Sequence, residues 1–424
     1  MRRNGFIAAL LAGVLASGTA LADTTIKVVE VITSPPRTAL LHQQFAAFEQ
    51  SRPGIHVDLI SLPWGQAFEK LLNMVQAGDI PDVVEMPERW LGLYGGNDQL
   101  VDLAPYMKDW KDAADLGPRA TQFGSVVNGK MYEIPYGYYV RALFWNKQLF
   151  QQAGLSSAPA TMDEFVADAK KIAAIPGKYG YCLRGGPGGF TSIQMFLNTY
   201  DNKGYFNADG TSTFNEPGSV KGLQTLVDIY QKGMAPKDSV NWAFNEVVSG
   251  FYTGTCAMLD QDPDALLGLA DKMADDAFAV APMPAGSGGK AYPAIGYGGW
   301  AMFASSNVKD QAWQLMSFML SPDNNLAWSK LVGTLPIYKS AASNPRFETD
   351  KYKGWLAELN DTNKYELVVV PSHLENLGNF FDNISVRTYQ QALLGQRSAQ
   401  DVANEWAGYL TKEQQAWMAK HGQK

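Results

Sequence analysis

Residues 55–85 read IHVDLISLPWGQAFEKLLNMVQAGDIPDVVE, and this stretch decides the fold class. The alternation of apolar and polar side chains over residues 55–60 is typical of a strand with one buried face. The next apolar residues recur at the spacing of one helical face, which ends at Gly78: Phe68, Leu71, Leu72 and Val75. Residues 80–85 predict a further strand, so the stretch predicts a strand–helix–strand unit.

The same pattern continues on both sides of this unit. Residues 26–31 predict an earlier strand, and the helix after it ends at residues 52–54 and buries Leu41, Phe45 and Phe48. A second unit begins with a capping box at residues 161–164 and continues to a strand at residues 179–183. A chain of 424 residues is too long for one core. We therefore predict an α/β fold with two lobes, each a mostly parallel sheet with helices on both faces.

The N-terminus has the three parts of a secretory signal peptide. Residues 1–3 are Met-Arg-Arg, residues 6–16 are apolar but too few to span a bilayer, and residues 20–22 form a small-x-small cleavage site. No cysteine follows the site, which argues against a lipid anchor. We expect residues 1–22 to be removed and a mature periplasmic protein to begin at Asp23.

The composition and net charge of the chain limit the kinds of molecule that it can bind. Hydrophobic residues make up 46% of the chain and charged residues 18%, as in ordered globular proteins. The net charge of -7, without any run of Lys or Arg, argues against nucleic acid and anionic lipid. Export permits a disulfide between Cys182 and Cys256, but both lie in strand-like runs where buried free thiols are also common, so the pairing stays open.

The sequence lacks the common catalytic and phosphate-binding motifs. Residues 286–290 are glycine-rich but lack the spacing of a phosphate-binding loop, and neither a GxSxG elbow nor an HExxH helix occurs. The histidines are too scattered to suggest a metal site. We therefore expect no metal, no cofactor and no enzymatic activity. Acidic residues are plentiful, so the carboxylate pair of a periplasmic glycoside hydrolase stays as an alternative.

Aromatic and hydrogen-bonding residues follow the predicted strands. Trp64 follows the second strand, Glu88 the third, and Arg184 the strand of the second unit. In open α/β sheets, ligands bind beyond the carboxyl ends of the strands. The stretch PYGYYVRALFWNKQLF at residues 135–150 is also rich in aromatic residues and fits neither a buried strand nor an amphipathic helix. Together these segments predict a ligand-binding site.

Several short segments resemble motifs of the extracellular solute-binding proteins of family 1, the carbohydrate-binding group of maltose-binding-protein type. They occur in the family's order across nearly the whole mature chain. Residues 78–83 match a GxxPDV segment, residues 143–155 an LxxNKxLFxxAG segment and residues 159–165 a P-x-TxxEF helix start. Residues 251–258 match an FxxGxxAM segment, and residues 386–387 and 395–399 match the final helices.

This resemblance implies a ligand cleft between two lobes, and a partner: the permease of an ABC importer, which accepts the closed, loaded form. We expect a monomer whose first lobe contains residues 23–136 and 297–335 and whose second lobe contains residues 137–296 and 336–424. The aromatic stretch then lies at the first crossover between lobes. The residues expected to face the cleft there are Tyr136, Tyr138 and Tyr139.

The family's positions also imply which residues bind the ligand. Sugar sites combine flat aromatic rings, which cover the apolar faces of the sugar, with Asp, Glu, Asn and Arg side chains that pair with hydroxyls. The resemblance carries these roles to Arg37, Trp64, Glu88, Tyr139, Arg184, Asp262, Gly298, Trp300, Asn383 and Arg387.

The identity of the ligand stays open. Asp262 and Pro263 stand where the family has a stacking Trp in its second lobe, and Asn383 replaces a late aromatic residue, so we expect a ligand smaller than a maltodextrin. Three arginines leave room for an alternative ligand, an acidic sugar derivative or a glycerol phosphodiester. The sequence predicts neither which sugar is bound nor which permease receives it.

Overall fold

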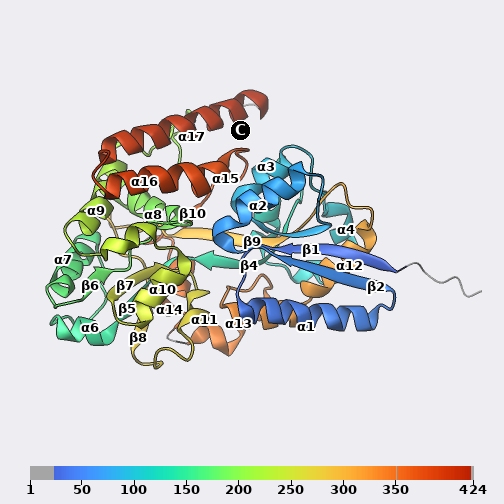
Figure 1. Cartoon of the computed structure of the whole chain (residues 1–424), viewed down its shortest axis with the longest axis horizontal. Helices are drawn as coiled ribbons and strands as arrows, with labels where there is room; N and C mark the ends of the chain where they lie inside the picture. The colour runs from blue at the N-terminus through green and yellow to red at the C-terminus, as the bar shows by residue number, and fades with distance from the viewer. Residues whose placement is uncertain (1–22, 350, 422–424) are drawn as a thin grey trace, which may run out of the picture.

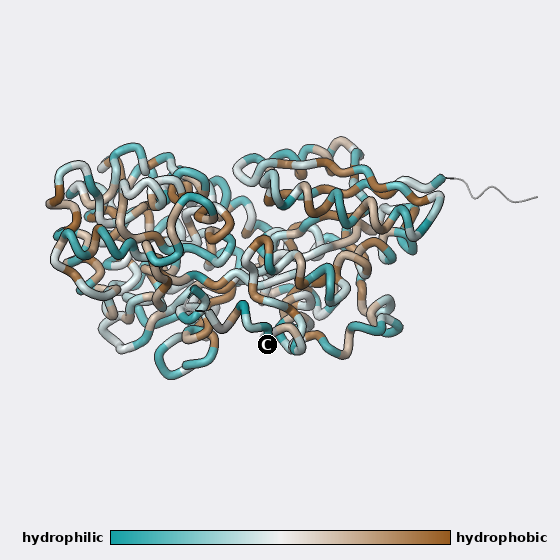
Figure 2. The backbone as a smooth tube through the Cα atoms, turned by 90° about the horizontal axis from the view of Figure 1, so that it is seen from below, coloured by the Kyte–Doolittle hydropathy of each residue, from teal (hydrophilic) through white to brown (hydrophobic). Residues whose placement is uncertain are grey.

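The computed structural model describes residues 23–349 and 351–421, so the predicted signal peptide at residues 1–22 lies outside the described residues. The described chain forms two β-sheets, one in each of two bodies that lie side by side (Figures 1 and 2). Within these ranges, none of the helices is both long enough and apolar enough to cross a membrane. The predicted two-lobed α/β fold is confirmed.

The first sheet has the strand order β10-β9-β3-β1-β2, with β4 paired to β9. β1 runs parallel to β2 and β3, whereas β9 runs antiparallel to β3 and β4. The strands are β1 (Thr24–Glu30), β2 (Ile55–Ser61), β3 (Val83–Pro87), β4 (Ile134–Val140), β9 (Ala294–Met302) and β10 (Val368–Val369).

Helices cover both faces of the first sheet (Figure 1). On one side lie α1 (Pro35–Ser51), α12 (Lys309–Met319) and α13 (Pro322–Val332); on the other lies α2 (Trp64–Gln76). The residues predicted to line α1 are buried, and Phe48 packs against Phe318 with ring centroids 5.6 Å apart. Segments far apart in the sequence therefore build this body together.

The second sheet has the order β6-β7-β5-β8, from β5 (Ala142–Asn146), β6 (Tyr179–Tyr181), β7 (Cys256–Gln261) and β8 (Phe278–Ala281). β6 and β7 are parallel, but β5 is antiparallel to both β7 and β8. The expectation of a mostly parallel sheet is therefore wrong for this lobe. The physical reason is that β5 enters between β7 and β8 directly from β4, without a crossover helix to reverse its direction.

The remaining elements surround these sheets. α7 starts at the predicted capping box, where Thr161 and Glu164 satisfy each other's backbone N–H groups. The helices are α3 (Leu91–Gly95), α4 (Ala104–Lys108), α5 (Pro118–Gly124), α6 (Lys147–Gln152), α7 (Met162–Ala173), α8 (Phe190–Asp201), α9 (Pro217–Gln231), α10 (Phe244–Tyr252), α11 (Ala265–Leu269), α14 (Lys353–Asn360), α15 (Leu377–Asn379), α16 (Ser385–Leu393) and α17 (Ala399–His421). Short 3₁₀ or π segments are Glu88–Trp90, Ala113–Asp115, Lys237–Asn241, Ser340–Ser343, Pro345–Glu348 and Phe380–Ile384.

Cys182 and Cys256 form a disulfide, with their Cα atoms 5.4 Å apart. Both cysteines are fully buried, and the bond joins the end of β6 to the start of β7. The question that the sequence left open is therefore resolved in favour of the bridge.

The chain passes between the sheets with a single residue, Arg141, between β4 and β5. The expected lobe boundary at residues 136/137 falls inside β4, which continues to pair with β9 up to Val140. β10, in a segment expected in the second lobe, pairs with β9 of the first sheet. The exact division into lobes remains a prediction, and the strands favour a crossover at Arg141.

Candidate functional site

Four predicted site residues follow the carboxyl ends of strands in the two sheets. Trp64 opens α2 after β2, and Glu88 opens the 3₁₀ turn after β3. In the second sheet, Arg184 follows β6 and Asp262 follows β7. Ligands of open α/β sheets bind at these ends, because the loops there converge from neighbouring strands.

Trp64 and Arg184 come together from the two sheets. A Cβ atom built on Gly188, in the loop after β6, would collide with the Arg184 guanidinium and would lie 3.2 Å from the Trp64 indole nitrogen. The Arg89 guanidinium also lies over the Trp64 ring, 4.4 Å from its centroid. This contact therefore places an aromatic face, an indole N–H and two guanidinium groups in one region.

Arg184 is a buried cation that lacks a full set of acceptors. Its side chain is 6% exposed, and its Nε donates to the carbonyl oxygen of Pro187 at 2.8 Å. Its Nη2 has no hydrogen-bond partner among the described residues. Burial, with repulsion from Arg141, lowers its pKa to about 9. A ligand acceptor at Nη2 would satisfy this group.

Three carboxyl groups interact with these arginines or with one another. Burial raises the pKa of Glu88 to about 7, opposed by Arg89 and reinforced by Asp262. Burial and repulsion from Asp262 also raise the pKa of Asp264 to about 7. Burial raises the pKa of Asp262, against the attraction of Arg141 and Arg184. Carboxyl groups held so far above their ordinary pKa are a frequent feature of binding and active sites.

Arg37 is held by a network within the first lobe. Its Nη2 donates to Glu85 Oε1 at 2.7 Å, and the Tyr136 hydroxyl donates to the same oxygen at 2.7 Å. The hydroxyls of Tyr136 and Tyr139 lie 2.9 Å apart. The Arg37 guanidinium also lies 4.7 Å from the ring centroid of Trp328. Tyr136 and Tyr139 thus belong to the hydrogen-bond network around Arg37. Glu85 also belongs to this network, and the sequence analysis did not predict it.

Arg141 joins the crossover to the second lobe's carboxylates. Its Nη1 lies 3.2 Å from Asp260 Oδ2, and its Nε lies 3.2 Å from Asp262 Oδ1. Asp260 Oδ2 also accepts from the Ser192 hydroxyl at 2.8 Å. The sequence offered a weak signal for this residue, because Arg141 is one of two cations in the aromatic stretch at residues 135–150, the other being Lys147.

A further ion pair links the first lobe to the segment before α16. Arg89 Nη2 lies 2.8 Å from Asp382 Oδ1, and Asp382 Oδ2 accepts from the indole N–H of Trp90 at 3.1 Å. Asp382 lies in the π-helical segment Phe380–Ile384. The two bodies are therefore in direct polar contact.

The sequence profile of the bacterial extracellular solute-binding proteins matches residues 33–326 of this chain. The chain belongs to this family.

Relatives of this solute-binding protein agree with that assignment. A Brucella abortus (strain 2308) protein named as a binding protein is 28% identical over 297 residues, which cover 70% of this chain and 72% of that protein. The sn-glycerol-3-phosphate-binding periplasmic protein of Yersinia pestis is 27% identical over 244 residues, which cover 54% of this chain and 52% of that protein.

Solved structures share the fold. The maltose-bound MalE3 of T. maritima superposes with a TM-score of 0.79 at 23% identity, covering 91% of this chain and 99% of that one. A Thermotoga lettingae solute-binding protein bound with α-D-tagatose gives 0.80 at 20% identity, with coverages of 93% and 100%. An Agrobacterium radiobacter solute-binding protein in complex with ribitol gives 0.77 at 23% identity, with coverages of 92% and 99%. At these identities the likeness establishes the fold of this solute-binding protein and no more.

The structure also describes the other predicted ligand residues of the solute-binding protein. Trp300 is 2% exposed, and its ring lies 6.1 Å from that of Tyr136; Gly298 is on the same strand, β9. Asn383 donates to Glu69 Oε1 at 2.8 Å, at the contact between the bodies. Arg387 is exposed on α16. Contact of these four residues with a ligand remains a prediction.

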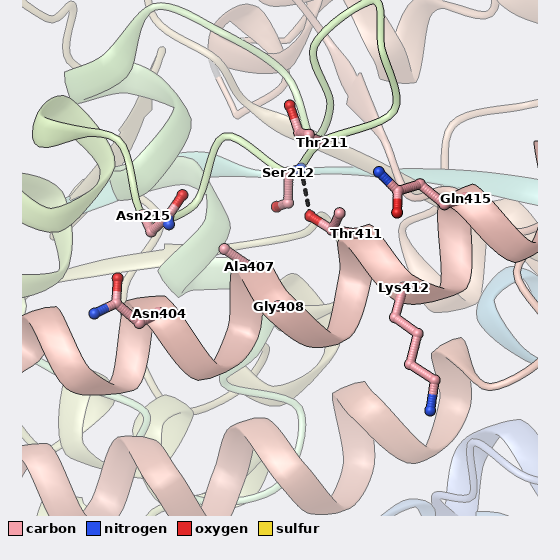
Figure 3. Close-up of a pocket in the computed structure, with 9 residues that line it drawn as sticks. All are labelled: Thr211, Ser212, Asn215, Asn404, Ala407, Gly408, Thr411, Lys412 and Gln415. Atoms are coloured by element: carbon pink, nitrogen blue, oxygen red, sulfur yellow. Dashed lines mark hydrogen bonds between the residues drawn. The ribbon is translucent and has the colours of Figure 1, made fainter.

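A surface groove of about 440 Å³ lies away from the predicted site, between residues 211–215 and α17 (Figure 3). The backbone N–H of Ser212 donates to the Thr411 hydroxyl at 2.9 Å, as Figure 3 shows. None of the predicted ligand residues lines this groove. The polar cluster between the two sheets is therefore the candidate site of the solute-binding protein.

Proposed function

We propose that this solute-binding protein captures a sugar or sugar-like solute between its two lobes and delivers it to the permease of an ABC importer. One observation carries the proposal: the Trp64 indole of the first lobe lies beside the buried, partly unsatisfied Arg184 guanidinium of the second. An aromatic face next to unsatisfied hydrogen-bonding groups is the chemistry that recognises a polyhydroxylated ring.

The comparisons support a polyhydroxylated ligand without assigning it. Structures of the same fold were solved with maltose, α-D-tagatose and ribitol. We infer that this chain acts in the same way, as a monomer exported by the signal peptide at residues 1–22, with no nucleic acid and no membrane as its binding partner. Within the described residues, no group of His, Cys, Asp and Glu side chains is arranged to hold a metal.

A second candidate ligand is an anion such as a glycerol phosphate ester. The Yersinia pestis relative is named for sn-glycerol-3-phosphate, and Arg184 Nη2 could donate a hydrogen bond to an anion. A thermal-shift screen separates the candidates, because a bound ligand raises the apparent stability. We expect a member of a panel of sugars and polyols to raise the melting temperature, and calorimetry then gives its affinity. If only glycerol phosphate esters do so, the sugar proposal is wrong.

The protein is further proposed to bind its solute without altering it. The ligand found in the screen is incubated with excess protein, and the mixture is compared with a protein-free control by chromatography. We expect full recovery of intact ligand. Cleaved product above the control would identify a glycoside hydrolase instead, with two of the carboxyl groups described above as the candidates for its acid and nucleophile.

A further inference from the structure

The polar cluster between the lobes has more acidic than basic groups. Three of its arginines have carboxylate partners within 3.2 Å: Arg37 with Glu85, Arg89 with Asp382, and Arg141 with Asp260. The arginine that remains is Arg184, which has no carboxylate within ion-pair distance among the described residues. Among the acidic residues, Glu88 and Asp264 are in none of these ion pairs. Asp262 pairs with Arg141, which also pairs with Asp260.

Two hydrogen-bond donors lie together on one side of this cluster. Arg184 Nη2 and the Trp64 indole nitrogen both border the position that a Gly188 side chain would take. Arg184 Nη2 is buried without an acceptor among the described residues, and Arg184 as a whole is more than nine-tenths buried. One ligand oxygen placed between the two donors could accept from both.

Acidic groups lie opposite these donors, and one of their oxygens is unsatisfied. Asp264 Oδ1 is buried without a donor, and the charges around Asp264 are those of Asp262, Arg37, Arg141 and Arg184. Besides burial, the groups that shift the pKa of Glu88 are Arg89, Asp262 and the backbone N–H groups of Glu88 and Tyr297. Two of these carboxyl groups have a pKa of about 7, so near neutral pH each is only partly ionised. Buried excess negative charge is costly unless a cation or protons neutralise it.

We propose that the solute is a sugar or polyol with a primary amine, bound with its ammonium group among Glu88, Asp262 and Asp264 and with a hydroxyl at Arg184 and Trp64. An ammonium group supplies three donors and one positive charge, which the carboxylates lack. With a neutral ring, only protons on Glu88 and Asp264 would neutralise this charge, and a phosphate or carboxylate would add to it. The inference rests on the proposed function, since it specifies the class of sugar at the same site.

The test uses ligands built on the same sugar ring that carry a positive group, no charge or a negative group. Glucose, galactose and mannose are each compared with their 2-amino form and their uronic acid by thermal shift and calorimetry with the full mature protein. We expect, for at least one ring, the amino form to bind at least tenfold more tightly than the other two. If, for every ring that binds, a neutral or acidic form binds as tightly as the amino form, the inference is overturned but the proposed function is left intact. If no carbohydrate raises the melting temperature, the proposed function itself fails, and the inference with it.

Variants and pH check the placement of the amine. Asp264→Asn should reduce the preference for the amino form over the neutral form at least tenfold. The control Asp58→Asn removes a carboxylate from the exposed side of β2 and should leave the preference unchanged. Affinity for the amino form should rise from pH 5.5 to pH 7.5, as Glu88 and Asp264 ionise. An unchanged preference in Asp264→Asn, or an affinity that falls over this range, contradicts the placement.

Discussion

Gly188 shows how one residue without a side chain shapes the contact between the lobes. Its φ is +79°, a conformation that residues with a Cβ rarely adopt. A Cβ there would also collide with the Arg184 guanidinium. The glycine is therefore required twice, by the backbone and by the neighbouring side chain.

We predict that Gly188→Ala weakens ligand binding at least tenfold, or about 1.4 kcal/mol, because the new methyl group displaces Arg184. The matched control is Gly177→Ala, since Gly177 has a similar φ of +74° but an ideal Cβ there meets no atom within 4 Å. Both variants lose stability through backbone strain, and only Gly188→Ala should lose affinity by calorimetry. Equal affinities in the two variants would show that Arg184 does not contact the ligand.

Trp64 is predicted to supply the aromatic face of the site. Trp64→Ala should weaken binding by more than about 1 kcal/mol, the usual threshold for an important contact. The half-buried Trp417 on α17 provides a control, because Trp417→Ala removes the same ring far from the candidate site. Calorimetry measures both affinities, and circular dichroism checks that both variants remain folded. A larger loss in Trp417→Ala would refute the assignment.

The raised pKa of Glu88 predicts how the unliganded protein responds to pH. A carboxyl group with a pKa of about 7 in the folded state and about 4.5 when unfolded holds more protons when folded between these values. The contribution of Glu88 to the free energy of unfolding therefore falls as pH rises from about 4.5 to 7. We expect the melting temperature of the unliganded protein to decrease from pH 5 to pH 8. Glu88→Gln should reduce this slope but not abolish it, because Asp264 titrates in the same range. An unchanged slope would contradict the assignment.

At the scale of elements, the disulfide fastens β6 to β7 next to the loops that carry Arg184 and Asp262. It closes a loop between residues 74 positions apart. Cross-links of this length stabilise folded proteins by roughly 2–5 kcal/mol, mainly by restricting the unfolded chain.

We therefore predict that the double variant Cys182→Ala/Cys256→Ala loses roughly 2–5 kcal/mol of unfolding free energy in urea denaturation. The parent protein measured in strong reductant is the control and should fall to a similar value. The two should also give matching circular dichroism spectra under native conditions. A variant as stable as the oxidised parent would mean that the bond contributes nothing to stability.

The elements that the sequence predicted are those set by local pattern. The periodicities of residues 26–85 gave β1, α1, β2, α2 and β3 nearly within their observed bounds, because each depends on neighbours a few residues away. The antiparallel position of β5 and the pairing of β10 with β9 depend on partners far along the chain, and no local pattern reports them.

The same distinction explains the candidate site. Trp64, Glu88 and Arg184 were predicted because each follows a recognisable strand and matches a family position, and Asp262 was predicted from the family resemblance. Asp382 was missed because its partner Arg89 lies 293 residues away in the chain. The pairing of Arg141 with Asp260 likewise exists only once β5 lies beside β7.

At the scale of the whole molecule, the ion pair between Arg89 and Asp382 joins the two bodies. Both side chains are largely buried, at 8% and 16% exposure. We predict that Asp382→Asn shifts the unliganded protein to a more open form, because it leaves the Arg89 cation buried and uncompensated, a change that typically costs about 3–5 kcal/mol. Small-angle X-ray scattering should show a larger radius of gyration.

The control for this variant is Asp98→Asn, which removes the carboxylate of the exposed ion pair with Lys130. Exposed pairs contribute little, so its scattering should match that of the parent. Saturating ligand should return Asp382→Asn to the compact form, because only a ligand that prefers the closed state can restore it. Identical radii for Asp382→Asn and the parent would show that the pair does not hold the lobes together.

The disulfide has one more consequence, for single-molecule measurements of motion between the two bodies. The chain contains two cysteines, and both are oxidised in the bond. A thiol-reactive dye therefore finds no native target, and any cysteine added by mutation becomes a unique attachment point. Lys70 on α2 and Lys170 on α7 are exposed and belong to different bodies. A donor and an acceptor dye at these two positions would turn each opening and closing of a single molecule into a change in energy transfer, with the native covalent structure left intact.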